Sequence, residues 1–309
     1  MTIRAWRQAW AVLALASFAT PGHGRESPSQ ITAALAASDP ALAALLRAHP
    51  RMQNGWREDF WADALLRAPA YPGSAWRVHD LRRPQPPVVH PPPAACAATH
   101  KPPPGAEVLF DGKGLAAFDP ATMGAWTRRG GLLISSGRKS SHLTTLDRFG
   151  DVRVHLEFRE PRPPAGDGQY RGNSGLILMD LYEIQILDSY DNPTYADGVL
   201  GALYGQSPPE VNAARPPGAW QCLDVDFTAP RFNAGLLASP ARATVRVNGV
   251  TVQDDQAFLG PTGFARLSHY APHAARLGFS LQDHESAGGV AFRDVWAVAL
   301  NPAEPGPSP

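Results

Sequence analysis

The chain has 309 residues, and its 28 lysines and arginines are balanced by 28 aspartates and glutamates. This balance argues against a nucleic-acid-binding surface, because phosphate binding requires a concentrated excess of cations. Apolar residues make up 44% of the chain and charged residues only 18%, which excludes a highly charged disordered protein. The 32 prolines and 28 glycines favour turn-rich β structure and linkers over a helical bundle.

Residues 1–24 have the pattern of a secretory signal peptide. Arg4 and Arg7 precede an apolar run from about Ala11 to Ala19, and small or helix-breaking residues follow it. The apolar run is too short to span a bilayer stably, and no later stretch predicts a transmembrane helix. We therefore expect an exported protein that is periplasmic or secreted.

Residues 25–80 predict a short helical extension. Asp39 followed by Pro40 is typical of a helix start, and leucines at helical spacing come next. A second candidate helix spans about Arg57 to Arg67 and carries aromatic residues on one face. Two helices of this length cannot bury enough apolar surface alone, so we expect them to pack on a larger domain or on a partner.

Residues 81–105 predict an extended linker, because nine prolines between Pro84 and Pro104 fix φ and remove backbone donors. The linker contains Cys96, one of two cysteines, and the other is Cys222. Two cysteines are too few for a disulfide scaffold or a cysteine-rich zinc site. Export makes a disulfide between them chemically permissible, and two free buried thiols are the alternative.

The spacing of apolar residues changes from 3.6 to 2 in residues 106–300. Apolar and charged side chains alternate through Val152–Arg159, which predicts a strand with one buried and one solvated face and places His155 on the solvated side. Asn248 and Gly249 between two alternating runs predict a β-hairpin. Many short strands without intervening helices indicate an all-β antiparallel sandwich or jelly roll.

The segment from Arg171 to Asp188 predicts two apolar strands joined by a tight turn. The second strand places Glu183 and Gln185 on one face, opposite an apolar face. Strict alternation puts Asp188 on the opposite face, unless a bulge or the strand end intervenes. A carboxylate and an amide on a rigid strand offer hydrogen-bonding groups suited to a polyhydroxylated ligand.

A series of motifs in one collinear order covers most of residues 106–300. The most informative of them run from Leu109 to Leu115, Leu156 to Arg159, Gly172 to Gly175, Tyr182 to Ser189, Gly201 to Gly205, Arg215 to Gln221 and Leu281 to His284. In these motifs the chain resembles the 3-keto-disaccharide hydrolase domain family. The resemblance implies a concanavalin A-like jelly roll and a lyase or hydratase acting on small-molecule 3-keto sugars. Residues 301–309 lie beyond it and predict a disordered tail.

The chemistry implied by this resemblance depends on the acidity of a 3-keto sugar. Oxidation at C3 acidifies the C2 proton, so elimination at C1 requires a base near C2, an acid near the glycosidic oxygen and donors for the enolate oxygen. Glu183 is the candidate base or acid, and His284 is the candidate second proton-transfer group. The candidate substrate-binding residues are Arg171, Asn173, Gln185, Asp188, Tyr204 and Asp283.

Several alternatives stay open at the level of the sequence. Glu183, Asp188, Asp283 and His284 are residue types that could ligate a divalent metal ion, although no dense ligand motif is present, so no cofactor is established. Glu183, Gln185 and Asp188 also resemble a variant of the catalytic strand of retaining laminarinase-type glucanases, from which the amide of Gln185 departs. A carbohydrate-binding module without catalysis is the other rival. The parent sugar, its linkage and the oligomeric state are not determined.

Overall fold

The computed structural model describes residues 40, 68–94, 96, 101–139 and 141–301. The predicted signal peptide, both candidate helices except Pro40, and residues 302–309 of the predicted tail lie outside the described residues. The predicted domain boundaries therefore stay predictions.

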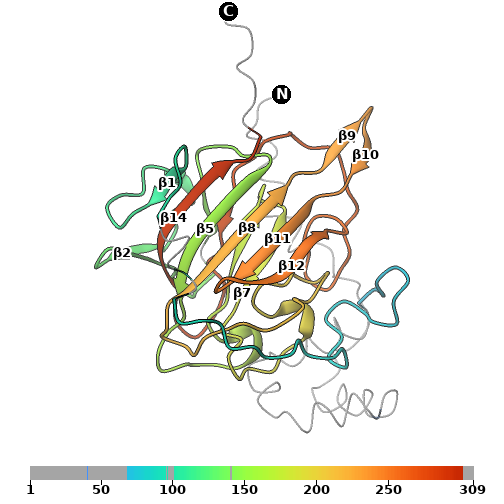
Figure 1. The fold of residues 1–309 in the computed structure, drawn as a ribbon, viewed down its shortest axis with the longest axis horizontal. Helices are drawn as coiled ribbons and strands as arrows, with labels where there is room; N and C mark the ends of the chain where they lie inside the picture. The colour runs from blue at the N-terminus through green and yellow to red at the C-terminus, as the bar shows by residue number, and fades with distance from the viewer. Residues whose placement is uncertain (1–39, 41–67, 95, 97–100, 140, 302–309) are drawn as a thin grey trace, which may run out of the picture.

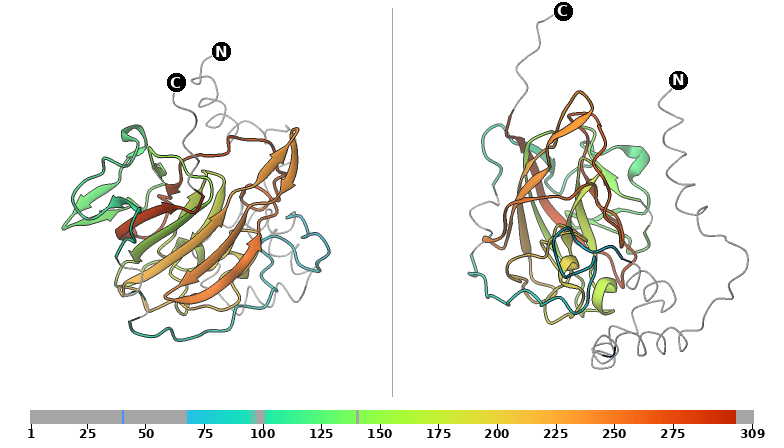
Figure 2. Two further views of the ribbon diagram at one scale, coloured as in Figure 1. Left: turned by 45° about the horizontal axis from the view of Figure 1, so that its top comes forward. Right: turned by 90° about the vertical axis from the view of Figure 1, so that its right-hand side faces the viewer.

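Two antiparallel sheets pack face to face as a jelly-roll sandwich, which confirms the predicted fold class (Figure 1). Figure 2 shows the two layers edge-on in its right-hand view. The larger sheet has the order β12-β11-β8-β5-β14-β3-β2, with β1 also paired to β14, and the smaller sheet has the order β4-β13-β6-β7. Strands β9 and β10 form a separate hairpin.

The larger sheet consists of β1 (Glu107–Phe110), β2 (Thr127–Arg129), β3 (Leu132–Ile134), β5 (Val152–Arg159), β8 (Gln221–Thr228), β11 (Arg242–Val247), β12 (Val250–Ala257) and β14 (Ala291–Ala299). The smaller sheet consists of β4 (Leu143–Thr144), β6 (Ser174–Leu178), β7 (Tyr182–Ile186) and β13 (Ser280–Leu281). The separate hairpin consists of β9 (Arg231–Asn233) and β10 (Leu236–Ser239).

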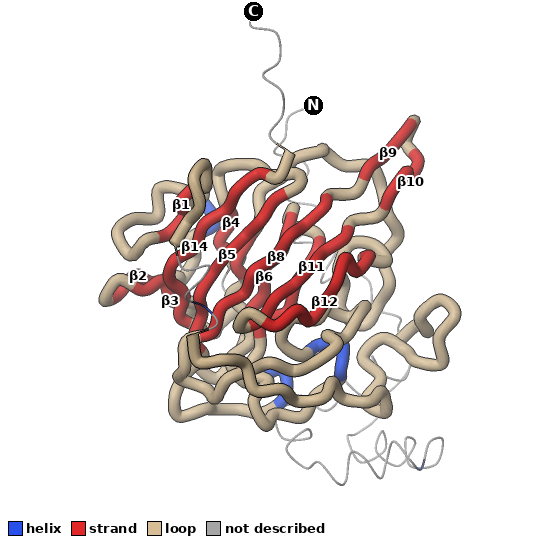
Figure 3. Tube along the Cα trace, viewed as in Figure 1, coloured by secondary structure: helices blue, strands red, loops and turns tan. Residues whose placement is uncertain are grey.

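In the described part of residues 68–301, helix is limited to short 3₁₀ turns (Figure 3). These turns are η2 (Pro120–Thr122), η3 (Gly168–Tyr170) and η4 (Ala196–Gly198). Within the described ranges, the chain contains no helix with the length and apolar character needed to cross a bilayer.

The alternation in β5 produces the predicted buried face, because Val154, Leu156 and Phe158 are fully buried in the core between the sheets. The prediction that His155 is solvated is wrong, since its side chain is also fully buried. The His155 Nδ1 atom lies 2.8 Å from Oδ1 of Asp224 on β8. Its ring stacks on Trp296 of β14, with centroids 5.2 Å apart. Side chains of both adjacent strands therefore cover His155, which the alternation of apolar and polar residues alone would place in solvent.

The predicted hairpin forms between β11 and β12. Its turn residues Asn248 and Gly249 have φ values of +51° and +77°, a left-handed conformation that Asn and Gly tolerate better than other residues. The Asn248 side chain also accepts the backbone N–H of Cys222 at 3.1 Å. The turn is thereby bound to the neighbouring strand β8.

The proline-rich segment packs along the sandwich and runs below the sheets in Figure 1, coloured cyan to teal. Val88 forms a parallel bridge with Asn212, and the Val89 N–H donates to the Asn212 carbonyl at 2.9 Å. Cys96 forms a disulfide with Cys222 of β8. The linker is therefore hydrogen-bonded and covalently joined to the domain that follows it.

This cross-link predicts that Cys96→Ser lowers the stability of the protein. The disulfide closes a loop between positions 126 residues apart. Its loss increases the conformational entropy of the unfolded chain, and removal of such a bond typically costs about 2–5 kcal/mol of stability. Urea unfolding with and without a reducing agent measures the effect. The reductant should bring the wild type to the midpoint of Cys96→Ser and leave the variant unchanged. Equal stability of both proteins in all conditions would contradict the cross-link.

Candidate functional site

Strand β7 presents two polar side chains on the outer face of the smaller sheet. Tyr182, Ile184 and Ile186 face the core, as predicted, and Glu183 and Gln185 face the other way. The tight turn between β6 and β7 contains Met179 and Asp180, both with positive φ. This turn sets the register that places Glu183 opposite Ile177 and Gln185 opposite Gly175.

The Glu183 carboxyl lies over Gly175 of β6. A Cβ atom built on Gly175 would lie 2.4 Å from Oε1 of Glu183, so only the missing side chain leaves space for the carboxyl. Gln282, which follows β13, donates from Nε2 to the same Oε1 atom at 3.1 Å. Its backbone N–H donates to the Gly175 carbonyl at 2.9 Å. Three strands of the smaller sheet therefore converge on one carboxyl group.

The environment of Glu183 favours its protonated form. The residue is only 6% exposed, and burial raises the pKa of its carboxyl to about 8, against the opposing effect of the Gln282 hydrogen bond. A carboxyl with this pKa can give up or take a proton near neutral pH. That property is what general acid or base catalysis requires.

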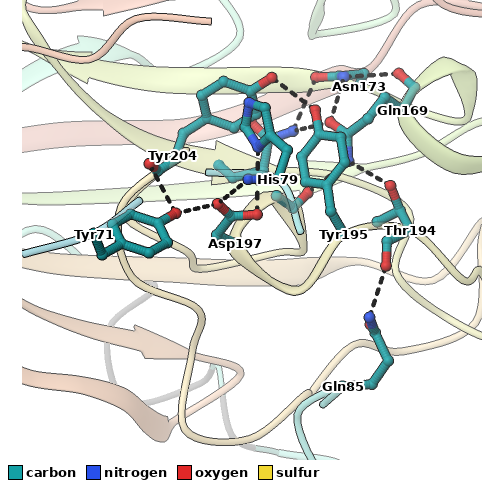
Figure 4. A network of polar contacts seen from close by, with 12 residues as sticks. Tyr71, His79, Gln85, Gln169, Asn173, Thr194, Tyr195, Asp197 and Tyr204 are labelled. Carbon is teal, nitrogen blue, oxygen red and sulfur yellow. Dashed lines mark hydrogen bonds and ion pairs between the residues drawn. The ribbon is translucent and has the colours of Figure 1, made fainter. Parts of the chain in front are cut away.

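Gln185 and Asn173 belong to a cluster of hydrogen-bonded amides, of which Figure 4 labels Asn173 and Gln169. Gln185 donates from Nε2 to Oε1 of Gln169 at 3.0 Å and to Oδ1 of Asn173 at 3.3 Å. Asn173 donates to the Gln169 carbonyl at 2.7 Å, and Gln169 donates to Thr194 and to the carbonyl of Gly198. The cluster connects the start of β6 with the loop after β7.

Two buried acceptor atoms belong to neighbours of Glu183: Gln282, which binds its carboxyl, and Gln185, two positions further along β7. In the part of the chain that the structure describes, Oε1 of Gln185 and Oε1 of Gln282 have no hydrogen-bond partner. An unsatisfied buried polar group costs about 1–3 kcal/mol, and a ligand that donates hydrogen bonds can recover this cost. Carbonyl oxygens beside an uncharged carboxyl suit the hydroxyl groups of a sugar.

Tyr204 lies beside β7, because its backbone N–H donates to the Glu183 carbonyl at 3.1 Å. Its hydroxyl lies 2.8 Å from the hydroxyl of Tyr195. Burial raises the pKa of both tyrosines well above the ordinary value. Both hydroxyls therefore stay protonated near neutral pH.

Arg171 and Asp188, two of the predicted substrate-binding residues, form a buried ion pair in which Arg171 Nε lies 2.9 Å from Asp188 Oδ2. Arg171 also donates to the carbonyls of Tyr190 and Asp191 in the loop after β7. These contacts give both residues a role in holding that loop, and their role in substrate binding stays a prediction.

A second buried carboxyl lies near this ion pair. Burial and the charge of Asp188 raise the pKa of Glu160 to about 8, while two hydrogen bonds from the Gln221 amide at 2.7 and 2.9 Å act in the opposite direction. Gly172 lies between the carboxyls, because a Cβ atom there would lie 2.8 Å from Glu160 and 3.1 Å from Asp188.

Asp283 and His284 lie in the loop after Gln282. The Asp283 carboxylate accepts the Ser136 hydroxyl at 2.5 Å and the Gly137 N–H at 2.8 Å. His284 Nδ1 lies 2.8 Å from the Glu285 carbonyl, and burial lowers its pKa. The hydrogen bonds described for His284 do not connect it with Glu183, so its predicted role in proton transfer stays a prediction.

The structure does not gather the predicted metal ligands. In the described ranges, no three His, Cys, Asp or Glu residues lie close enough together to hold a metal ion. Asp188 is paired with Arg171, and Asp283 binds a neighbouring loop.

Sequence reasoning missed three side chains of the site: Gln282, Gln169 and Tyr195. Gln282 stands in a motif that matches the family, yet its contact with Glu183 joins positions 99 residues apart. Gln169 and Tyr195 lie in loops, where no periodic pattern indicates which way a side chain points.

The fold defines an antiparallel β-sandwich domain. More specifically, the chain belongs to the 3-keto-alpha-glucoside-1,2-lyase-like domain family, whose sequence profile matches residues 105–298. This match confirms the resemblance found in the sequence.

Two solved structures are similar to this chain to different degrees. A candidate glycosyl hydrolase from Parabacteroides distasonis is 34% identical, with a TM-score of 0.62 over 74% of this chain and 99% of its own. Another candidate glycosyl hydrolase from the same organism is 17% identical, with a TM-score of 0.44 over 64% of this chain and 95% of its own. No curated protein matches the chain significantly.

The two buried carboxyls predict that stability falls as pH rises. Glu160 and Glu183 have raised pKa values of about 8, so the folded protein binds more protons than the unfolded chain, whose glutamates titrate near 4.3. Their contribution is fully present below the unfolded pKa and is lost as pH rises through the folded pKa. Urea unfolding measures the free energy of unfolding at about pH 5 and about pH 9. Its decrease between the two pH values should be smaller in Glu160→Gln and in Glu183→Gln than in the wild type.

The control for this prediction is Glu210→Gln, which makes the same chemical change at an exposed position. It should lose as much stability as the wild type between the two pH values. An equal loss in all four proteins would show that neither buried carboxyl has a raised pKa.

Proposed function

We propose that this protein is an exported enzyme that cleaves or hydrates 3-keto glycosides by deprotonation at C2 and elimination or hydration at C1. The observation that carries the proposal is the buried Glu183 carboxyl, which lies over Gly175 with a pKa of about 8. A proton-transfer group of this kind, in a chain of the 3-keto-alpha-glucoside-1,2-lyase-like family, matches the requirement for removing a C2 proton.

The reaction proceeds in two balanced stages. A base takes the C2 proton, the electron pair forms the C1–C2 double bond, and the C1–O bond breaks while the departing oxygen receives a proton. Water then adds across the double bond, with hydroxyl at C1 and hydrogen at C2. The first stage alone is elimination, the second alone is hydration, and the two together give net hydrolysis. Ionised Glu183 is the base of the first stage, and its protonated form returns the proton to C2 in the second.

The polar atoms around Glu183 support a sugar as the ligand. The unpartnered oxygens of Gln185 and Gln282 would accept bonds from sugar hydroxyls, and the protonated hydroxyl of Tyr204 would donate to a sugar oxygen. Aligned donors toward the C3 oxygen would stabilise the enolate that forms during C2 deprotonation.

The glucanase alternative finds less support in the geometry around Gln185. A retaining glucanase of that type requires an acid at this middle position. The Gln185 amide donates to Gln169 and Asn173, so a carboxylate there would face two acceptor oxygens. A binding module without catalysis is the other alternative, and the raised pKa of Glu183 favours an enzyme over it.

The proposed location is the periplasm or the exterior of the cell. The signal-peptide pattern in residues 1–24 supports export. The disulfide between Cys96 and Cys222 also supports it, since disulfides persist in oxidising compartments.

The test is turnover of a 3-keto disaccharide and of its unoxidised parent by the purified protein, with and without a chelator, followed by product chromatography. The enzyme should release sugar only from the keto compound. Glu183→Gln keeps the volume of the side chain but cannot exchange the proton, so turnover should fall about 10²- to 10⁴-fold while folding is retained.

Gly175→Ala is the companion variant, because its methyl group would displace the Glu183 carboxyl from the Gln282 amide without removing it. It should also lose turnover. Equal cleavage of the keto and parent sugars would indicate a glucanase mechanism, and sugar binding without turnover would indicate a binding module. Wild-type turnover by folded Glu183→Gln would exclude Glu183 as the proton-transfer group.

A further inference from the structure

A segment that precedes the family-matched region reaches into the neighbourhood of Glu183. Tyr71 and His79, in residues 68–83, both contact Asp197 of η4 (Figure 4). The Tyr71 hydroxyl donates to Oδ2 of Asp197, and the His79 backbone N–H donates to the same oxygen at 2.8 Å. The His79 Nδ1 atom lies 3.3 Å from the other carboxylate oxygen. All three residues are buried.

The His79 ring packs against the tyrosine pair of the site. Its centroid lies 4.0 Å from that of Tyr195 and 5.1 Å from that of Tyr204. The two tyrosine hydroxyls lie 2.8 Å apart, and the Tyr204 N–H donates to the Glu183 carbonyl. A continuous set of contacts therefore leads from the extension to the strand that carries Glu183.

The hydrogen bonds fix the orientation of the His79 ring. Since Nδ1 faces a carboxylate that can only accept, the Nδ1 atom carries a proton and donates it toward Asp197. Nε2 is buried and has no hydrogen-bond partner in the part of the chain that the structure describes. Although burial raises the pKa of Asp197, its contacts with His79 and Tyr71 outweigh burial and lower that pKa, which favours the charged carboxylate that holds the ring.

Backbone geometry at two positions also favours this placement. His79 has a φ of +57°, a left-handed conformation that few residues other than glycine adopt, although histidine adopts it more often than most. Gly205 faces the ring, since a Cβ atom on it would lie 3.3 Å from Cε1 of His79. A strained backbone conformation persists where the surrounding contacts hold it in place. Here the Asp197 carboxylate holds His79 through both the backbone N–H and the ring Nδ1 atom.

We propose that residues 68–83 complete the site and that His79 is a positioning residue, which holds the hydroxyl pair of Tyr195 and Tyr204 in place beside Glu183. The inference deepens the proposed function and rests on it for the identity of the substrate. It assigns a part in the site to a segment outside the matched residues 105–298. A displaced hydroxyl pair would present its donors poorly to the sugar oxygen on which charge develops.

The test uses the full-length protein and His79→Gly, with added imidazole. Glycine adopts the φ of +57° without strain, so this variant removes the ring while sparing the backbone. We expect kcat on the 3-keto disaccharide to fall about 10- to 100-fold with a smaller change in KM. Imidazole that enters the vacated space should restore part of kcat.

Hydrogen exchange of the peptide covering residues 195–206 is the readout that needs no substrate. The Tyr204 and Gly205 amides donate to the carbonyls of Glu183 and Asp197, so their exchange should quicken in His79→Gly and slow again with imidazole. Tyr71→Phe removes the hydroxyl contacts with Asp197 and with the Gly205 carbonyl but keeps the His79 ring, so it should show the same changes to a smaller degree and no response to imidazole. If His79→Gly does not fold, Tyr71→Phe tests the inference in its place.

Ala234→Gly is the matched control, because Ala234 has a φ of +48° in the exposed turn between β9 and β10. Its kcat, its exchange pattern and its response to imidazole should match those of the wild type. Unchanged kcat and exchange in folded His79→Gly would overturn the inference and leave the proposed function intact. Absence of wild-type turnover would overturn the proposed function, and the exchange measurements would then decide the inference alone.

Discussion

The burial of the Glu183 carboxyl beside an uncharged amide is the constraint on which the rest of the site depends. The Glu183 side chain occupies the space that Gly175 leaves on the outer face of the smaller sheet. Its partner there is the uncharged amide of Gln282. An ionised carboxylate is costly in such a place, so the fold stabilises the protonated form and raises the pKa toward neutral pH. The same burial that costs stability above neutral pH gives the group its capacity for proton transfer.

The surroundings of Glu183 are held by contacts between segments that are distant in the chain. Gln169 and Asn173 hold the amide of Gln185, and Asp197 anchors the loop that carries Tyr204 to the extension before the domain. A jelly roll is suited to this arrangement, because its strands are stiff and its long connections bring polar side chains to one edge. The rigid sheet fixes the carboxyl, and the loops complete its environment.

The sequence predicted the features that depend on local patterns. Alternation placed Glu183 on the outer face, and the Asn248-Gly249 pair located the hairpin. The burial of His155 could not be predicted, since Asp224 and Trp296 cover it from other strands. The contact of Gln282 with Glu183 and the reach of His79 to Asp197 likewise depend on tertiary structure, over separations of 99 and 118 residues. Periodicity carries no information at such distances.

The titration of Glu183 by carbon NMR is the most direct measurement of the central claim. With glutamate carboxyl carbons labelled, the wild type should show a resonance that titrates near pH 8 and disappears in Glu183→Gln. Glu160 also has a raised pKa, and Glu160→Gln separates its signal from that of Glu183. A Glu183 resonance that titrates near the ordinary value of about 4.3 would show a solvated carboxylate and contradict the account.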